Sequence, residues 1–265
     1  MSIDYYLANN KKYYVSVTNT LPLDGYAYVS LFNDNGEVLL KDIKSSYDIG
    51  GIRAAVSNDG KLFATAAYSR KGVDLRDSNG DLVWNTKEIK KVQGLAFSSN
   101  GEYLYVWNGD EPEHTYYVRI LDGKIEKRIV ASWIKPNNYS DDLIFDKQNS
   151  LIIGGKKVKS PSFAYLDAVT TKEGIIVSPV GKDLMMYDYN GNLKWVSNFV
   201  KDNEYNHIIQ LFQDENYLYG LSLDHTVYRI NTLSGDCESI KNNIKFIINN
   251  KTYIDINDNF IKDFN

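Results

Sequence analysis

The fold is predicted from the stretch Ile52-Arg-Ala-Ala-Val-Ser-Asn-Asp-Gly60, which is followed by Leu62-Phe-Ala-Thr-Ala-Ala-Tyr68. It consists of an apolar strand, a tight polar turn that ends in glycine, and a second apolar strand. The same phrase recurs as Val92-Gln-Gly-Leu-Ala-Phe-Ser-Ser-Asn-Gly101, followed by Tyr103-Leu-Tyr-Val-Trp107. Equivalent turns therefore repeat at a spacing of roughly 40 residues, which is the period of a β-propeller blade.

Alternating and short apolar runs divide the rest of the chain into units of four strands. Three regular units are expected at 4–43, 53–85 and 94–130, and the fourth strand of the first unit is expected at 38–43. After Val130 the pattern weakens. There, 143–145 and 151–153 are expected as the first two strands of a degenerate unit that has no clear third or fourth strand. Two more units are expected at 163–199 and 208–240, and a short one at 245–264.

The sequence thus predicts an all-β chain in which residues 1–265 form a single β-propeller domain. The blades are expected to be four-stranded and antiparallel, and to number seven, with one degenerate, or six. Asn-Gly and Asp-Gly pairs supply the positive φ angles that tight hairpin turns require. The first strand, at 2–8, is expected to pair either within the first unit or with the short last unit.

Two segments carry a family resemblance. Residues 54–65 and 95–105 both read as a strand, a Ser-x-Asp/Asn-Gly turn and a second strand. This pattern resembles the WD40 and YVTN-type β-propellers over nearly the whole chain, and the resemblance implies a propeller fold. The Gly-His pair and the Trp-Asp dipeptide of strict WD40 blades are missing, since Trp84 is followed by Asn85 and Trp107 by Asn108. The structural tetrad of that family is therefore not carried over.

Composition narrows the class of protein. The chain has no apolar run of the roughly 20 residues that span a bilayer, and it lacks the pattern of a signal peptide. Cys237 is the single cysteine, which agrees with a reducing compartment, so a cytoplasmic location is expected. The net charge of −4 argues against general nucleic-acid binding. Abundant Asn, Lys, Ile and Tyr suggest an AT-rich, bacterial gene.

Catalytic and metal-binding patterns are weak. His114, in the acidic segment 110–114, is interpreted as part of a solvated loop rather than a metal ligand. The segment 188–192 copies the opening spacing of a calcium loop but is better explained as a hairpin turn. The basic run at Lys156, Lys157 and Lys159 is interpreted as a solvated strand-end loop. The prediction is therefore a protein that is not an enzyme and holds no cofactor or metal.

The longer connections, expected on one face of the propeller, are rich in acidic and aromatic residues. Carboxylates speed the encounter with a basic protein, and aromatic side chains anchor it. The connection 131–140 is the best single candidate, being long and carrying Trp133 and Tyr139. The candidate partner-binding residues are Tyr47, Asp48, Asp110, Glu111, Glu113, Trp133, Tyr139, Asp141, Asp142, Asp202, Glu204 and Tyr205.

The resulting hypothesis is a non-catalytic propeller that binds a basic protein. Its small size and acidic character resemble the immunity proteins that neutralise bacterial toxins, many of which are basic nucleases. Two alternatives stay open: an enzyme or a sugar- or metabolite-binding protein that uses a central channel, and a general protein-interaction scaffold. Expected first-strand cores such as 54–56, 95–97 and 143–145 offer a channel almost no carboxylate or imidazole, which disfavours the enzyme.

Overall fold

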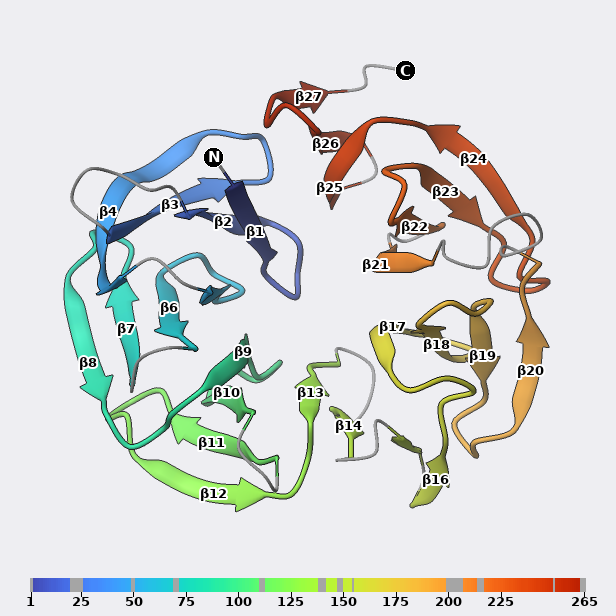
Figure 1. Ribbon diagram of the computed structural model, residues 1–265, viewed down its shortest axis with the longest axis horizontal. Coiled ribbons are helices and arrows are strands. Elements are labelled where there is room, and N and C mark those ends of the chain that lie inside the picture. Colours follow the sequence, from blue (N-terminus) through green and yellow to red (C-terminus); the bar gives the residue numbers. More distant parts are fainter. Residues whose placement is uncertain are drawn as a thin grey trace. The chain divides into compact units, whose positions relative to one another are not determined.

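The computed structural model describes residues 2–19, 26–48, 51–68, 72–109, 113–137, 142–146, 150–153, 155–198, 207–213, 217–249 and 251–262. The side chains of residues 2, 19, 47 and 48 are not described. Backbone packing divides the chain into two compact units, Met1–Asn138 and Tyr139–Asn265. Every described element is a β-strand or a turn (Figure 1).

The first unit contains three antiparallel sheets of four strands each, in which the strands follow one another in chain order. We call the strands of each sheet a to d, and the sheets blades 1 to 3. Blade 1 consists of β1 (Ser2–Leu7), β2 (Tyr13–Asn19), β3 (Tyr26–Asn33) and β4 (Val38–Asp48). Blade 2 consists of β5 (Ile52–Val56), β6 (Leu62–Ala67), β7 (Val73–Asp77) and β8 (Leu82–Thr86). Blade 3 consists of β9 (Val92–Phe97), β10 (Tyr103–Asn108), β11 (Thr115–Arg119) and β12 (Ile125–Ile129), and β13 (Trp133–Lys135) follows it.

The second unit contributes four further sheets. Blade 4 includes β14 (Leu143–Phe145), β15 (Leu151–Ile153) and β16 (Lys156–Val158). Blade 5 consists of β17 (Tyr165–Thr171), β18 (Gly174–Pro179), β19 (Met185–Tyr187) and β20 (Leu193–Val196). Blade 6 consists of β21 (Ile208–Gln213), β22 (Leu218–Ser222), β23 (Val227–Ile230) and β24 (Cys237–Lys241). Blade 7 has three described strands, β25 (Ile244–Asn249), β26 (Thr252–Asp255) and β27 (Phe260–Lys262).

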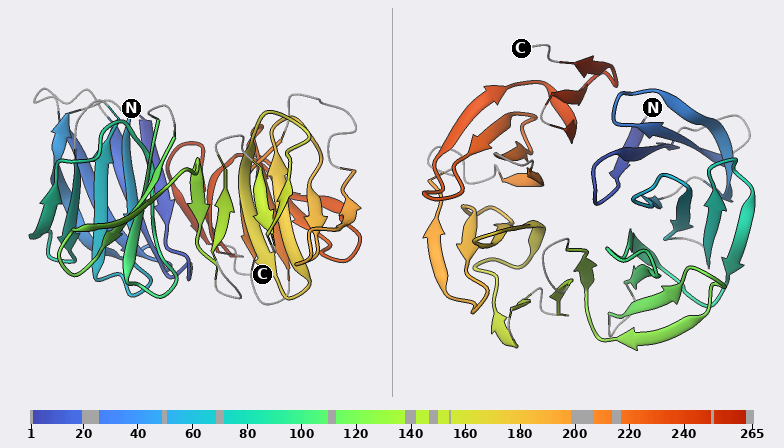
Figure 2. Two further views of the ribbon diagram at one scale, coloured as in Figure 1. Left: turned by 90° about the horizontal axis from the view of Figure 1, so that it is seen from below. Right: turned by 180° about the vertical axis from the view of Figure 1, so that it is seen from behind.

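The predicted fold class is confirmed: the chain is all-β and has the seven antiparallel blades of a β-propeller. The first strand pairs with β2 along its whole length, from Ser2 opposite Asn19 to Leu7 opposite Tyr14. Of the two pairings left open for this strand, the one within the first blade is therefore present. In the first unit the strands of successive blades run side by side (Figure 2).

The core lies between neighbouring blades, because the inner strands are apolar on both faces. In β6, Phe63 packs into the cluster shared with blade 1, whereas Ala64 packs into the cluster shared with blade 3. Successive strand residues point to opposite faces of a sheet, so one strand serves both clusters. The same arrangement joins blades 5 and 6, where Met186 and Leu211 belong to one cluster.

Polar side chains also tie the first strands of neighbouring blades. Each bond runs between a side chain of one strand and the backbone of the next. The pairs are Tyr6 Oη to the Ile52 carbonyl at 3.0 Å, Arg53 Nε to the Gln93 carbonyl at 2.9 Å, the Leu211 N–H to Asp167 Oδ2 at 2.8 Å, and Gln210 Nε2 to the Ile247 carbonyl at 2.9 Å. These contacts satisfy backbone groups that a strand edge otherwise leaves open.

The c–d turns share one local design. Asp77 Oδ1 accepts the backbone N–H groups of the residues two and four positions on, both at 2.9 Å. Asp188 Oδ1 does the same at 2.9 and 2.8 Å, so the segment 188–192 is a hairpin turn, as predicted. Gly80 and Gly191 take positive φ angles of 89° and 77° in these turns. Glycine adopts this conformation without the steric cost of a Cβ, which explains the Asn-Gly signature.

Two segments differ from the prediction. The strand expected at 38–43 continues to Asp48, because its backbone keeps pairing with β3 as far as Tyr26 opposite Asp48. Tyr47 and Asp48 therefore lie in a strand and not in a connection. The basic run is also not a loop: Lys156 and Lys157 lie in β16, and Lys157 Nζ forms an ion pair of 2.6 Å with Asp146.

Candidate functional site

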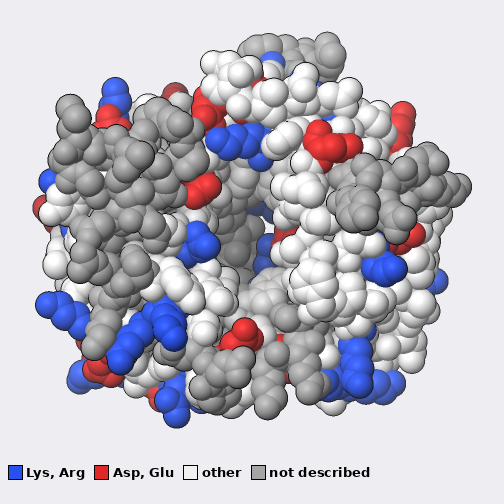
Figure 3. Space-filling view, in the orientation of Figure 1, with Lys and Arg blue, Asp and Glu red and all other residues white. Residues whose placement is uncertain are grey.

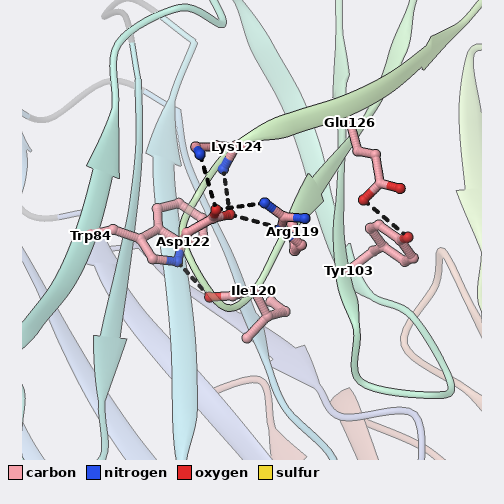
Figure 4. A network of polar contacts seen from close by, with 7 residues as sticks. All are labelled: Trp84, Tyr103, Arg119, Ile120, Asp122, Lys124 and Glu126. Carbon is pink, nitrogen blue, oxygen red and sulfur yellow. Dashed lines mark hydrogen bonds and ion pairs between the residues drawn. The ribbon is translucent and has the colours of Figure 1, made fainter.

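Two tryptophans fix the c–d turns of the following blades. In the first unit, Trp84 of β8 donates its indole N–H to the Ile120 carbonyl in the turn of blade 3, at 2.7 Å (Figure 4). The indole also packs against Gly123, where an added Cβ would lie 2.8 Å from the ring. In the second unit, Trp195 of β20 makes the same hydrogen bond to the Thr232 carbonyl at 2.9 Å and packs on Gly235.

Beside the first of these turns lies a groove with a volume of about 530 Å³. We call it the blade-3 groove. It is lined by Gly101, Glu102, Tyr103, Arg119, Ile120, Leu121 and Glu126. Leu121, in the turn, is 84% exposed and offers an apolar side chain to the groove.

The charges of the blade-3 groove are arranged in two sets (Figure 4). Arg119 binds Asp122 with two parallel bonds, Nε to Oδ1 at 2.9 Å and Nη2 to Oδ2 at 2.6 Å. These bonds lower the pKa of Asp122 to about 2, and Lys124, with Nζ 3.6 Å from Asp122 Oδ2, adds to the effect. Separately, the Tyr103 hydroxyl donates to Glu126 Oε2 at 3.2 Å, which raises the pKa of Tyr103.

A comparable groove of about 560 Å³ lies on blade 6, and we call it the blade-6 groove. Its lining comprises Tyr217, Arg229, Ile230, Asn231, Thr232, Leu233, Asp236, Cys237 and Glu238. Arg229 Nη2 lies 2.6 Å from Glu238 Oε2, and its guanidinium lies 5.4 Å from the centre of the Tyr217 ring. Leu233 is 77% exposed, like its counterpart in blade 3.

The single cysteine lines the blade-6 groove. Cys237 is half-buried, and burial raises the pKa of its thiol to about 12. A thiol with such a pKa is protonated at neutral pH and is a poor nucleophile. Cys237 is therefore a half-buried thiol of low reactivity.

Three of the predicted site residues have described side chains. In the first unit, the hydroxyl of Ser132 donates a hydrogen bond to Glu113, and Trp133 is the next residue along the chain. Trp133 is half-buried and opens β13, so the connection expected at 131–140 contains a strand. Asp142 is half-buried just before β14 in the second unit.

The side chains of the other predicted site residues are not described. The backbone of Tyr47 and Asp48 forms the end of β4. Asp110, Glu111, Tyr139, Asp141, Asp202, Glu204 and Tyr205 lie outside the described residues. The predicted acidic and aromatic face therefore stays a prediction. On the face drawn in Figure 3, basic and acidic side chains of described residues are interspersed.

Other residues considered from the sequence have structural partners. The backbone N–H of His114 donates to Asn108 Oδ1 at 3.1 Å, and its ring lies 6.3 Å from that of Tyr116. Asp167 places a carboxylate in a first strand, but its oxygens accept the backbone N–H groups of Ala168 and Leu211, both at 2.8 Å. Among the residues that the structure describes, no group of three or more His, Cys, Asp or Glu side chains is placed to hold a metal ion.

Sequence reasoning missed both grooves. A signal was present, since Tyr103-Leu-Tyr105 and Tyr217-Leu-Tyr219 repeat in the second strands of blades 3 and 6. The segments Asn79-Gly-Asp-Leu-Val-Trp84 and Asn190-Gly-Asn-Leu-Lys-Trp195 likewise repeat before the two turns. These repeats identify the tryptophans that support the grooves.

Comparison with known proteins gives no family assignment. No family model matches the chain, and no curated protein matches it in sequence. Within the described part of the chain, no helix has the length and apolar character needed to cross a membrane.

Proposed function

We propose that this protein is a non-catalytic, cytoplasmic binding protein whose propeller captures and inhibits a basic protein, as an immunity protein does with a bacterial toxin. One observation carries the proposal: two blades present tyrosine, arginine and exposed leucine side chains in grooves whose turns are held by tryptophan contacts. Tyrosine and arginine are among the residues that dominate binding energy at protein interfaces. A rigid support reduces the entropy that such residues lose on binding.

The preference for a basic partner follows from charge. The chain carries a net charge of −4, and opposite charge accelerates the encounter between two proteins. In the first unit, Glu113 accepts a hydrogen bond from Ser132, the residue before Trp133. We expect Glu113 and Trp133 to share the predicted face, where a carboxylate and an aromatic ring suit a lysine or arginine on the partner.

The non-catalytic part of the proposal follows from how turn residues are used. Ser57 donates its hydroxyl to Asp59 at 2.7 Å and accepts the Leu62 N–H at 3.0 Å. Ser98 repeats this arrangement with Asn100 and Tyr103. These hydroxyl and carboxylate groups stabilise their own turns, since short polar side chains commonly bond to neighbouring backbone.

The test is affinity capture with the tagged full chain, at moderate and at high salt, from cells that contain the candidate partner. A basic protein recovered in near-equal amount, and released by salt, is the expected result. The double variant Glu113→Gln/Trp133→Phe should reduce recovery several-fold, because it removes one charge and the indole, while the amide that replaces the carboxylate still accepts the Ser132 bond. The charge-matched control is Glu88→Gln, which alters an exposed residue of the same unit.

Two outcomes contradict the proposal. If the double variant recovers the partner as well as the wild type does, the predicted face is wrong. If the captured protein is acidic, or resists high salt, the inhibitor role through charge attraction is wrong. Melting temperatures of all variants establish that each is folded before recovery is compared.

A further inference from the structure

The two grooves are built from corresponding strands of their blades, but their charged side chains are paired differently. In both blades a Tyr-Leu-Tyr strand b supplies the groove, and the central leucine, Leu104 or Leu218, is fully buried. In blade 6, Arg229 lies opposite Tyr219 in the ladder and is paired with Glu238 on the other side. The positions of Arg229 and Glu238 correspond by register to Tyr117 and Lys127 in blade 3.

Blade 6 places a cation of its own, Arg229, in the lining of its groove. The Arg229 guanidinium lies 5.4 Å from the Tyr217 ring centre and 2.6 Å from a Glu238 oxygen. An aromatic face and a carboxylate together suit a guanidinium, which binds through both its flat surface and its N–H groups. In blade 6, an aromatic ring and a carboxylate thus both contact one guanidinium.

In blade 3, Tyr103 and Glu126 supply an aromatic ring and a carboxylate, but Arg119 binds Asp122 instead of Glu126. Arg119, directly opposite Tyr103 in the ladder, directs its Nε and Nη2 donors to Asp122. The Tyr117 ring meets Tyr103 edge-on at 5.9 Å, and Lys127 Nζ lies over Tyr117 at 5.0 Å. Among the described residues, Glu126 has the Tyr103 hydroxyl as its hydrogen-bond partner and no cation within ion-pair distance (Figure 4).

A second carboxylate strengthens the preference for a cation. Glu102 also lines the groove and accepts a bond from Asn100 Nδ2 at 2.9 Å. Arg119 and Lys124 both pair with Asp122, and the lining itself carries two glutamates, Glu102 and Glu126, against one cation, Arg119. The hydrogen bonds to Asp122 raise the pKa of Arg119 most, and the charge of Glu126 adds a smaller effect. Arg119 therefore offsets only part of the negative charge of the lining.

We infer that the blade-3 groove binds an arginine side chain of a protein partner, with the guanidinium held between the Tyr103 ring and the Glu126 carboxylate. Exposed Leu121 provides an apolar contact for the methylene part of the arginine. That the arginine belongs to a protein rests on the proposed function. The binding of the guanidinium itself does not.

The experiment uses the purified full chain with ¹³C-labelled tyrosine and follows the Tyr103 signal by NMR; Tyr103→Phe assigns that signal. The probes are N-acetylarginine amide and N-acetylcitrulline amide, which have nearly the same shape but differ in charge. The arginine probe should shift the Tyr103 signal in a saturable way, and the citrulline probe should not. Glu126→Gln should weaken arginine binding about fivefold, the effect of one exposed ion pair. Glu88→Gln, the charge-matched control, should leave it unchanged within about twofold.

The inference is overturned if citrulline shifts the signal as arginine does, or if Glu126→Gln binds arginine as tightly as the wild type. Should Glu126→Gln melt at a lower temperature, the comparison of the arginine and citrulline probes on the wild type decides, and equal shifts of the Tyr103 signal overturn the inference. The two proposals fail separately. If the arginine probe binds but no protein is captured, guanidinium binding by the blade-3 groove is supported and the proposed function is contradicted. If a basic protein is captured and its recovery is unchanged by Glu126→Gln, the proposed function is supported and the role of the blade-3 groove is contradicted.

Discussion

Replacement of Trp84 by alanine should lower the free energy of unfolding by about 2–3 kcal/mol. The indole N–H bond to the Ile120 carbonyl at 2.7 Å contributes about 1 kcal/mol, as a typical intramolecular hydrogen bond does. Truncation of a fully buried aromatic residue costs about 3–5 kcal/mol. Because Trp84 is only half-buried, the loss of its contacts with Gly123 and its neighbours should amount to a smaller share of that cost.

Two further variants separate these contributions. Trp84→Phe keeps an aromatic ring but has no N–H group, so it should cost about 1 kcal/mol. Leu82→Ala, in the same strand, changes a side chain that is 52% exposed and should stay within about 0.5 kcal/mol of the wild type. The measurement is urea unfolding followed by circular dichroism, with midpoint and slope compared for each variant. If Trp84→Ala is no more destabilising than Leu82→Ala, the tryptophan does not stabilise the turn.

Two other predictions concern single positions. Gly174→Ala should lower the free energy of unfolding by about 3 kcal/mol or more, because φ is 150° and an added Cβ would lie 2.1 Å from the Tyr187 carbonyl oxygen. Gly155→Ala, where φ is 78° and no atom lies within 4 Å, should cost only about 1 kcal/mol. Equal shifts in melting temperature for the two variants would contradict the steric reasoning. The pKa of Asp122 is about 2 in the folded chain and about 3.9 when unfolded, so its stabilising effect is present above pH ~4 and is lost as the pH falls toward 2. Urea midpoints should accordingly fall more between about pH 4 and 2 for the wild type than for Asp122→Asn, and parallel curves would refute this.

The blade pattern was predictable from sequence where local chemistry is strong. The turn at 57–60 combines a serine, an aspartate and a glycine that all act within four residues, so the segment itself specifies the hairpin. The strand β16 was not predictable, since it has only three residues and two of them are lysines. Its pairing with β15 depends on the partner strand rather than on its own sequence.

The candidate site was less predictable. The blade-3 groove draws its side chains from three strands, and an irregularity between Tyr117 and Val118 shifts the register that places Glu126 near Tyr103. A period-two pattern cannot predict such a shift. The predicted grouping of acidic and aromatic residues stays a prediction: Glu113 bonds to Ser132, and Trp133 lies in a strand that the sequence pattern did not predict.

The bonds between neighbouring blades also bear on how the chain is made. The tryptophan bonds join residues 36 and 37 positions apart, and the bonds between first strands span at most 46 positions. At a synthesis rate of about 5–20 residues per second, each such contact becomes available about 2–9 s after its first residue is made. Short separations keep the entropic cost of closing each loop low. Within each unit, a blade that these bonds join to the preceding one can therefore dock on it in the order of translation, so that the apolar faces between them are covered soon after they leave the ribosome.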